Sequence, residues 1–437
     1  MYFTVEPSAL TSGKVTVPGD KSISHRALML GAIAEGQTRI RGFLNGEDCL
    51  ATLAALRDMG VKIEQLSDTE LIIEGCGSAG LKPPSAPLDM GNSGTAMRLF
   101  AGLLAGQPFS SMLIGDQSLS QRPMDRVIKP LTEMGAKIES AAGKPPLEIH
   151  AGQSLSGITY RPPVASAQVK SALLLAGLSA DNETSIIEPA ITRDHTERML
   201  RSMGAELSVV DTQIIMPGKQ VLQGTGIEVP GDFSSAAFIV LAALLAPQCE
   251  VVITNVGVNP TRTGALDILR DMGADIKVDN VRLYGEEPVA DIIVRSSELT
   301  GIDVDPARVS LAIDEFPMLF VAAAGARGKT TFSGIGELRV KESDRIGVMA
   351  EGLRQLGATV EVTDDGAVVH GATLAGGRVN SHGDHRIAMA FAVAGAFARW
   401  PVRIDDTHAV STSFPGFVNC LRGLGINIAS YGEASAS

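Results

Sequence analysis

Short polar clusters that precede Ala- and Leu-rich stretches carry the residues of this sequence that could do chemistry. In the first cluster, Lys21, Ser22 and Arg26 lie close together, and Arg26 stands four residues after Ser22. Residues four apart share one face of a helix. A helix N-terminus also offers unpaired N–H groups and the positive end of the helix dipole. These three side chains could therefore close around one phosphate or carboxylate.

Five similar clusters follow along the chain. In the second cluster, Arg98 stands four residues after Gly94, whose missing side chain would let a ligand approach the backbone. A capped helix with a solvated arginine would explain any single cluster, but their recurrence favours anion binding. The clusters run from Ser22 to Arg26, Asn92 to Thr95, Ser166 to Gln168, Asp232 to Ser235, Asp314 to Pro317 and Asp384 to Arg386.

A segment from Arg339 to Arg345 has five charged side chains in seven positions. Its composition alone is typical of a solvated loop. Guanidinium groups bind phosphates and carboxylates through paired hydrogen bonds, however, and proton transfer needs a lysine or a carboxylate. The candidates for proton transfer are Lys21, Asp314 and Glu342. The candidate anion-binding arginines adjoin Gly, Pro or Asp-His elements; they are Arg122, Arg193, Arg345 and Arg386.

Two familiar phosphate-binding patterns fail because of their context. Gly75 to Gly80 has the spacing of a dinucleotide-binding loop, but Lys82-Pro83-Pro84 prevents the helix that must follow. Gly328-Lys329-Thr330 resembles the end of a Walker loop, yet a helix is expected before it and a strand after it, which is the reverse of the required order. His382 and His385 lack the neighbours of a metalloprotease helix, so no metal is expected.

The elements that position these clusters repeat six times. The phrase Leu-x-x-Met/Leu-Gly, followed by a β-type stretch, recurs at intervals of roughly 70–85 residues. It predicts the last turn of a helix, a left-handed Gly that ends the helix, and then a strand. Each unit then holds one buried helix, one amphipathic helix and several strands, which predicts an α/β protein. The phrase begins at Leu56, Leu131, Leu200, Leu269, Leu353 and Leu421.

A repeated turn predicts the domain boundary. Val17-Pro18-Gly19-Asp20 recurs as Val229-Pro230-Gly231-Asp232, and three of the units lie between the two copies. We expect lobe I to comprise residues 1–19 and 231–437 and lobe II residues 20–230, with crossings near 18–20 and 230–232. Paired crossings are natural hinges, so closing lobes are expected. Ordinary turns between fixed lobes are the alternative.

The composition excludes several classes of protein. The chain has 437 residues and a formal net charge of −12, which argues against nucleic acid and anionic membranes as partners. Its four cysteines have no zinc or redox spacing, which favours a reduced, cytoplasmic protein. We expect neither a signal segment nor a membrane helix. An acidic exterior also favours a soluble monomer.

Four segments closely resemble the motifs of the EPSP synthase (3-phosphoshikimate 1-carboxyvinyltransferase) family of enolpyruvyl transferases. These are Pro18 to Arg26, Gly91 to Arg98, Arg339 to Arg345 and Asp384 to Arg386, and the match continues in order to Ser413-Phe414-Pro415. The resemblance implies a two-lobed inside-out α/β barrel with three βαβαββ repeats in each lobe. It also implies transfer of the enolpyruvyl group of phosphoenolpyruvate to the 5-hydroxyl of shikimate 3-phosphate, within aromatic amino acid biosynthesis and without a cofactor.

The resemblance assigns the candidate residues to the two substrates. Asp314 matches the family's proton acceptor for the 5-hydroxyl, and Glu342 with Lys21 would protonate the methylene carbon of phosphoenolpyruvate. The residues expected to bind shikimate 3-phosphate are Lys21, Ser22, Arg26, Ser166, Ala167 through its backbone, Gln168, Arg193, Asp314 and Lys341. Those expected to bind phosphoenolpyruvate are Lys21, Gly94, Arg122, Gln168, Arg345 and Arg386.

The sequence departs from many members of the family at three places. Ser411 to Pro415 lacks the lysine of the phrase Lys-Thr-Phe-Pro, Ala167 replaces a serine, and Leu99 replaces a proline. These differences resemble a divergent branch of the family. Gly94 leaves room for glyphosate, a mimic of phosphoenolpyruvate, so sensitivity to glyphosate is expected.

Two alternative functions stay open from the sequence. The enolpyruvyl transferases that act on UDP-N-acetylglucosamine pair their lysine with Asn and usually carry a loop cysteine, whereas here Ser22 follows Lys21 and residues 115–125 contain no cysteine. A non-catalytic sensor of phosphorylated ligands would need the arginines, but it would not need Lys21, Asp314 and Glu342 together.

Overall fold

The computed structural model describes residues 1–432, which form two compact units. Unit 1 contains Met1–Pro18, Pro230–Arg282 and the chain from Pro288 onward, and unit 2 contains Gly19–Val229 and Leu283–Glu287. Each unit has its own core of buried aliphatic side chains. Helices alternate with strands throughout, which confirms the predicted mixed α/β class.

Unit 2 has three four-stranded sheets with one common pattern. Their strand orders are β14-β3-β5-β4, β6-β7-β9-β8 and β10-β11-β13-β12. In each sheet the first two strands are parallel and the remaining pairs are antiparallel. The elements are α1 (Lys21–Ile33), β3 (Glu35–Arg41), α2 (Glu47–Asp58), β4 (Lys62–Ser67), β5 (Glu70–Cys76), β6 (Leu88–Asp89), α3 (Gly94–Leu104), β7 (Ser111–Ile114), η1 (Leu119–Gln121), α4 (Asp125–Glu133), β8 (Ile138–Ala141), β9 (Lys144–Ile149), β10 (Thr159–Tyr160), α5 (Ala167–Gly177), β11 (Thr184–Ile187), α6 (His195–Ser202), β12 (Ser208–Val210), β13 (Gln213–Met216) and β14 (Gly226–Glu228).

Unit 1 has the sheets β16-β17-β15-β2, β18-β20-β19 and β21-β22-β1-β23. Strand β2 pairs parallel with β15, and β21 pairs parallel with β22. The elements are β1 (Tyr2–Val5), β2 (Gly13–Thr16), α7 (Phe233–Leu245), β15 (Glu250–Gly257), α8 (Gly264–Asp271), β16 (Asp275–Tyr284), β17 (Glu287–Arg295), η2 (Pro306–Arg308), α9 (Val309–Ala312), α10 (Phe316–Gly325), β18 (Lys329–Phe332), η3 (Gly336–Val340), α11 (Arg345–Gln355), β19 (Val360–Thr363), β20 (Gly366–His370), β21 (Gly377–Asn380), α12 (His385–Ala396), β22 (Val402–Asp405), η4 (His408–Thr412), α13 (Phe417–Gly423) and β23 (Ile428–Tyr431).

The tip of the β16–β17 hairpin belongs to unit 2. There Glu286 and Glu287 contact one face of α6. The Glu287 Oε1 atom lies 3.1 Å from His195 Nδ1, and Arg198 Nη1 donates to the Glu286 carbonyl at 2.7 Å. Arg201 Nη2 lies 2.9 Å from Glu286 Oε2. Unit 2 is therefore built from two separate stretches of the chain.

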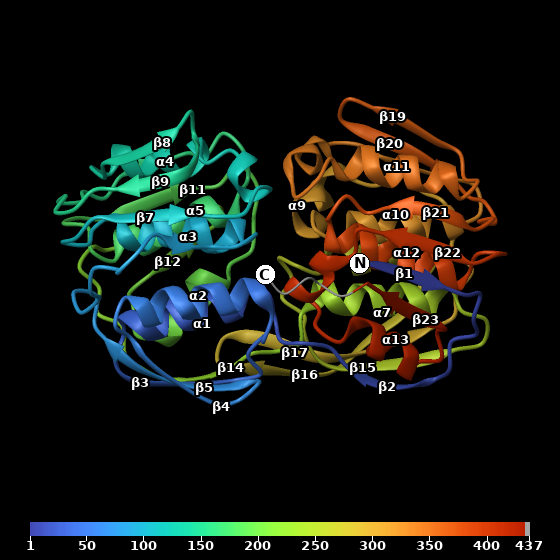
Figure 1. Cartoon of the computed structure of the whole chain (residues 1–437), viewed down its shortest axis with the longest axis horizontal. Helices are drawn as coiled ribbons and strands as arrows, with labels where there is room; N and C mark the ends of the chain where they lie inside the picture. The colour runs from blue at the N-terminus through green and yellow to red at the C-terminus, as the bar shows by residue number, and fades with distance from the viewer. Residues whose placement is uncertain (433–437) are drawn as a thin grey trace. The chain divides into compact units, whose positions relative to one another are not determined.

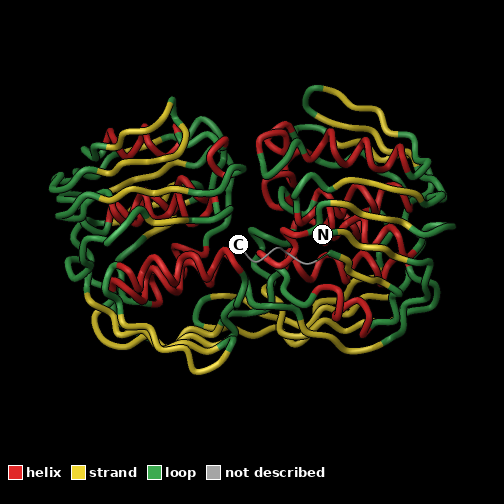
Figure 2. Tube along the Cα trace, viewed as in Figure 1, coloured by secondary structure: helices red, strands yellow, loops and turns green. Residues whose placement is uncertain are grey.

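In each unit the apolar helices lie against strands that form the outer layer (Figure 2). In unit 2, α1 packs on the sheet that contains β3, β4 and β5, and α3 packs against α5 (Figure 1). Helix α7 illustrates why such helices are interior elements. Every residue from Phe233 to Leu244 is buried, because the segment has apolar or small side chains on all faces.

Polar residues cap most of these buried helices. Asp20 accepts a hydrogen bond from the Ile23 N–H at 2.9 Å, which satisfies one of the donors that a helix start leaves unpaired. Helix α10 is an exception among these helices, because Glu315 at its N-cap makes no side-chain capping bond. The capping side chains are Asp20 for α1, Ser93 for α3, Ser166 for α5, Asp232 for α7 and Asp384 for α12.

The prediction of a left-handed glycine after six helices is confirmed. At the end of α2 the Gly60 N–H donates to the Arg57 carbonyl and the Val61 N–H donates to the Leu56 carbonyl, both at 3.0 Å. This is the bond pattern of a Schellman-type helix end, which needs a positive φ. The six glycines have φ between 85° and 104°; they are Gly60, Gly135, Gly204, Gly273, Gly357 and Gly425.

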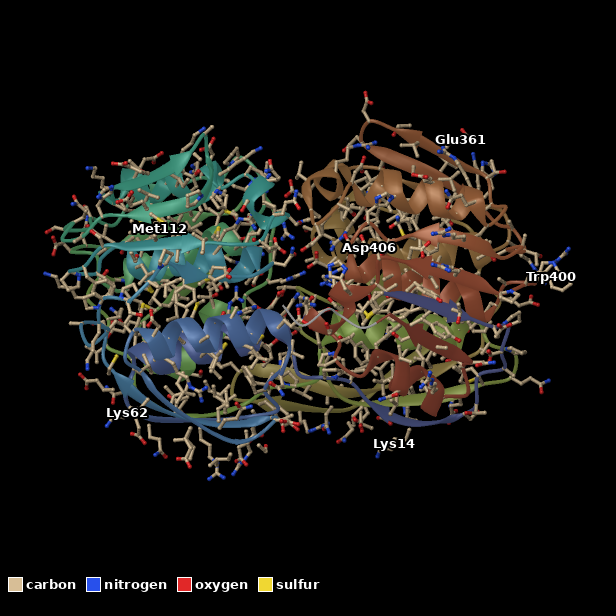
Figure 3. All side chains as sticks on the ribbon, viewed as in Figure 1. Lys14, Lys62, Met112, Glu361, Trp400 and Asp406 are labelled. Atoms are coloured by element: carbon tan, nitrogen blue, oxygen red, sulfur yellow. The ribbon has the colours of Figure 1, made fainter. Side chains whose placement is uncertain are left out.

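Among the described residues, no helix is both long and apolar enough to span a bilayer. The four cysteines are not joined in disulfides. Trp400 is the one tryptophan of the sequence; it is 70 % exposed and projects from the edge of unit 1 (Figure 3).

Candidate active site

The first turn of α1 carries Lys21, Ser22 and Arg26 in unit 2. The Lys21 ammonium lies 3.0 Å from Asp48 Oδ2, at the start of α2. Arg26 Nη1 donates to the Ser22 carbonyl at 2.9 Å, so Ser22 and Arg26 share a helix face as predicted. Asp48 was not among the predicted site residues, although it stands in the first turn of a helix, where acidic residues are favoured.

Arg26 is held by two hydroxyl groups from distant parts of unit 2. Its Nε donates to Thr196 Oγ1 and its Nη2 donates to Ser171 Oγ, both at 2.7 Å. Its side chain is nearly fully buried. The two hydroxyl groups also hydrogen bond to each other at 2.7 Å. The two hydroxyl groups therefore help to fix the orientation of the guanidinium.

His25 lies beside these cationic groups but cannot serve as an acid near neutral pH. The pKa of His25 is lowered to about 3, chiefly by burial and also by the charges of Lys21 and Arg26. The neutral ring bonds to Thr52 Oγ1 at 2.8 Å and contacts Ser93 Oγ at 3.4 Å. His25 thus joins α1 to α2 and to the capping residue of α3.

Gln168, in the first turn of α5, is fixed by two residues of α3. Arg98 Nη1 donates to Gln168 Oε1 at 2.6 Å, and Gln168 Nε2 donates to Thr95 Oγ1 at 2.9 Å. Together with the contact between His25 and Ser93, these bonds bring the N-terminal turns of α1, α3 and α5 together. The positive ends of three helix dipoles then face one region, which suits an anion.

Gly94 lies directly against two guanidinium groups. A Cβ atom at this position would lie 3.1 Å from both Arg122 Nη1 and Arg98 Nη1. Arg122 is buried and donates from Nη2 to Asn92 Oδ1 at 2.5 Å. The absence of a side chain at Gly94 therefore allows both arginines to approach the start of α3.

A buried ion triad anchors the segment that carries Arg193. The Lys170 ammonium lies 2.9 Å from Glu188 Oε2 and 2.7 Å from Glu197 Oε1, and it also donates to the Thr192 carbonyl at 3.4 Å. Lys170 belongs to α5, next to Ser166, Ala167 and Gln168, which begin that helix. The half-buried Arg193 is thus flanked by anchored residues on either side. The sequence did not show which carboxylates would pair with Lys170.

In unit 1, Arg345 is the most enclosed of the predicted site residues. It begins α11, and its side chain is 1 % exposed. Its Nε lies 2.8 Å from Asp384 Oδ2, and its Nη2 lies 2.6 Å from Glu342 Oε2. Burial alone would lower the pKa of Arg345, but the charges of Asp384 and Glu342 raise it above its ordinary value. Arg345 therefore stays charged while it links α11 to the start of α12.

Asp314 lies between Arg345 and Arg386. Its Oδ1 is 3.5 Å from Arg345 Nη1, and its Oδ2 is 3.7 Å from Arg386 Nη2. Arg386 Nη1 also donates to the Asp314 carbonyl at 3.0 Å. Burial lowers the pKa of Arg386, and the nearby charge of Arg345 lowers it further. Unit 1 thus combines a carboxylate with two cationic anion receptors.

Lys341 and Glu342 extend this set from the loop between η3 and α11. Lys341 Nζ lies 3.8 Å from Glu337 Oε1, and both Lys341 and Glu342 are partly exposed. Glu342 therefore reaches the Asp314 group through its ion pair with Arg345, and Lys341 precedes it in the same loop. The structure brings Asp314, Glu342, Arg345 and Arg386 together through direct contacts.

Comparison with known proteins identifies the family of this chain. The family model described as EPSP synthase (3-phosphoshikimate 1-carboxyvinyltransferase) matches residues 5–421. The chain belongs to the EPSP synthase family. Proteins named 3-phosphoshikimate 1-carboxyvinyltransferase are 54 % identical over 431 residues in Legionella pneumophila, covering 99 % of this chain and 100 % of the relative. A protein of the same name from Halorhodospira halophila is 56 % identical over 426 residues, covering 97 % and 96 % of the two chains.

A solved EPSP synthase supports the same assignment at the level of structure. The EPSP synthase of Acinetobacter baumannii is 51 % identical to this chain, with a TM-score of 0.88, and the match covers 98 % of this chain and 100 % of that one. The predicted membership in this family is confirmed.

Proposed function

We propose that this chain is a 3-phosphoshikimate 1-carboxyvinyltransferase. It transfers the enolpyruvyl group of phosphoenolpyruvate to the 5-hydroxyl of shikimate 3-phosphate and releases phosphate. The observation that carries this proposal is the Asp314 carboxylate between the Arg345 and Arg386 guanidiniums, at 3.5 and 3.7 Å. The Asp314 carboxylate can accept a proton, and the two guanidinium groups beside it suit the carboxylate or phosphate of a small anion.

The helix N-termini of unit 2 supply the second set of anion-binding groups in this proposal. Lys21 and Arg26 place two positive charges at the start of α1, and the starts of α3 and α5 add N–H groups and dipoles. Shikimate 3-phosphate is bound by Lys21, Ser22, Arg26, Ser166, Ala167, Gln168, Arg193, Asp314 and Lys341 in this proposal. Phosphoenolpyruvate is bound by Lys21, Gly94, Arg122, Gln168, Arg345 and Arg386.

The proposed reaction is an addition followed by an elimination. Glu342, with Lys21, gives a proton to the methylene carbon of phosphoenolpyruvate, and the neighbouring carbon becomes cationic. The 5-hydroxyl oxygen bonds to that carbon while Asp314 accepts the hydroxyl proton. The tetrahedral adduct then loses phosphate, and one proton of its new methyl group returns to the Glu342 and Lys21 pair that donated it, which restores the double bond. The guanidinium groups compensate the negative charge of both substrates.

The finer architecture belongs to the same proposal. Two lobes of three βαβαββ repeats each would close at the turns Val17–Asp20 and Val229–Asp232, which excludes water from the reaction. All five four-stranded sheets have a parallel pair at one edge, which supports a repeated unit. We also propose a cytoplasmic monomer, in keeping with the net charge of −12.

A phosphate-release assay tests the proposed function. The purified chain should release inorganic phosphate when phosphoenolpyruvate and shikimate 3-phosphate are both present, with a chelator in the buffer. Omission of either substrate should abolish the release. No release with both substrates at neutral pH would refute the proposal, and release with UDP-N-acetylglucosamine in place of shikimate 3-phosphate would favour the alternative acceptor.

A further inference from the structure

Glu315 follows the proposed proton acceptor directly, and its side chain does not cap the helix that it precedes. It is 2 % exposed, so its carboxylate needs other partners within unit 1. The Ser234 hydroxyl donates to Glu315 Oε1 at 2.5 Å. The same oxygen lies 3.5 Å from Arg386 Nη1 and 4.0 Å from Arg262 Nη2. One buried carboxylate oxygen is thus shared by a hydroxyl and two guanidinium groups.

Arg262 belongs to this cluster and not to the proposed substrate-binding set. It is 4 % exposed, and its Nη2 donates to Ser234 Oγ at 2.7 Å. It also lies 3.5 Å from Asp232 Oδ1, at the N-cap of α7. Buried charges are tolerated only when they are paired. The positive charge of Arg262 faces Asp232 at 3.5 Å and Glu315 at 4.0 Å, and Arg262 and Glu315 both bond to Ser234.

The cluster contacts Arg386 on the side of its Nη1 atom. That atom also donates to the Asp314 carbonyl at 3.0 Å, whereas Nη2 lies 3.7 Å from the Asp314 carboxylate. Arg386 and Arg345 are both buried and both positive, so they repel each other through a poorly screened environment. Without a negative charge near Nη1, this repulsion and the cost of burial would favour displacement of the Arg386 guanidinium.

We propose that Glu315 is a positioning residue that holds Arg386 beside Asp314 for phosphoenolpyruvate, and that Ser234 and Arg262 hold Glu315 in place. Glu315 acts through Arg386 and does not contact substrate. This inference rests on the proposed function, in which Arg386 binds phosphoenolpyruvate. A change at Glu315 should therefore weaken the binding of phosphoenolpyruvate and leave the binding of shikimate 3-phosphate unchanged.

Steady-state kinetics of Glu315→Gln test the inference, because glutamine keeps the shape and the acceptor oxygen but removes the charge. The KM for phosphoenolpyruvate should rise about tenfold, the size expected for one charge-assisted contact. The KM for shikimate 3-phosphate should change by less than about twofold. Glu361→Gln is the matched control, because Glu361 is an exposed glutamate of unit 1 (Figure 3) and should leave both KM values unchanged.

Two further variants keep the test decisive if Glu315→Gln folds poorly. Ser234→Ala removes only the hydroxyl that anchors Glu315, and it should raise the KM for phosphoenolpyruvate about threefold. If Arg262 acts only through Glu315, then adding Arg262→Gln to Glu315→Gln should produce no further change in that KM.

The outcomes separate the inference from the proposed function. A wild-type chain that releases no phosphate would overturn both. If the wild type turns over and Glu315→Gln or Ser234→Ala loses only thermal stability, with the KM for phosphoenolpyruvate unchanged, the role of Glu315 is merely structural and the inference fails. Equal increases in the KM values of both substrates would also overturn it.

Discussion

Replacing Lys170 by methionine should destabilise unit 2 strongly, because it breaks a buried ion triad. The Lys170 side chain is 1 % exposed, and the side chains of Glu188 and Glu197 are 5 % and 2 % exposed. Methionine fills most of the same volume but leaves two carboxyl groups buried without their cation. Breaking a buried pair by removing one partner costs about 3–5 kcal/mol.

An exposed ion pair in the same unit provides the matched control. Lys219 Nζ lies 2.9 Å from Asp181 Oδ1, the same separation as that between Lys170 and Glu188, but these side chains are 70 % and 63 % exposed. Solvent screens such a pair, so Lys219→Met should cost less than about 1 kcal/mol. Both variants lose one lysine, and burial is the difference between them.

The pH dependence of the Lys170→Met defect has a defined sign. Burial raises the pKa of Glu188, and Lys170 opposes that rise. Without Lys170 the pKa of Glu188 in the folded state rises further above its value in the unfolded chain. The folded state then binds the proton more tightly, so stability is retained at low pH and is lost as the pH rises through the folded-state pKa. The defect should therefore be larger near pH 8 than near pH 5.

Urea unfolding followed by circular dichroism, together with hydrogen exchange of the α5 and α6 amides, measures this effect. Tryptophan fluorescence would not report it, because Trp400 lies in unit 1 and is 70 % exposed. The reasoning is refuted if Lys170→Met and Lys219→Met unfold at the same urea concentration, or if the defect of Lys170→Met grows as the pH falls.

Three other expected outcomes follow from the site. Gly94→Ala should raise the KM for phosphoenolpyruvate about tenfold, because its Cβ would lie 3.1 Å from two guanidinium nitrogens and overpacking costs about 1–3 kcal/mol. Gly226→Ala is the control: its Cβ would meet nothing within 4 Å, so it should change neither KM. Asp314→Ala should lower kcat far more than it weakens substrate binding, and an unaffected rate in the phosphate-release assay would remove its role as proton acceptor. The pKa of His25 is lowered to about 3 in the folded chain, so the unfolded chain binds the proton first as the pH falls. Stability should therefore decrease as the pH falls from the pKa of His25 in the unfolded chain to its pKa in the folded chain. In urea titrations from pH 7 to pH 4, His25→Asn should show a shallower loss than the wild type, and parallel curves would contradict that pKa.

Features that depend on neighbours in the sequence were predictable. Gly60 and its five counterparts end helices because the residue at that place has a positive φ, which glycine adopts most easily. The glycine in the phrase is therefore enough to predict the end of the helix. Asp20 and Asp384 likewise cap the helices that follow them. The cluster at Asp314 to Pro317 provides no such cap, because the Glu315 side chain bonds to Ser234 in α7 instead.

Partners from distant parts of the chain were not predictable. Arg26 and Thr196 are 170 residues apart, and Lys170 in α5 pairs with Glu197 in α6 and with Glu188 in the loop after β11. A single sequence shows that Lys170 is a charged residue in an apolar helix, but it does not show which carboxylates compensate that charge. Pairing of this kind depends on how the helices and sheets pack, which the hydrophobic pattern alone does not specify.

The hairpin tip at Leu283–Glu287 means that unit 2 is not a single segment of the gene. A fragment of residues 19–229 would lack Glu286 and Glu287, and the basic face of α6 would lose two carboxylates and a carbonyl acceptor. Chimeras between relatives should therefore exchange the tip together with residues 19–229. A graft of the longer segment alone would join an α6 from one parent to a hairpin tip from the other.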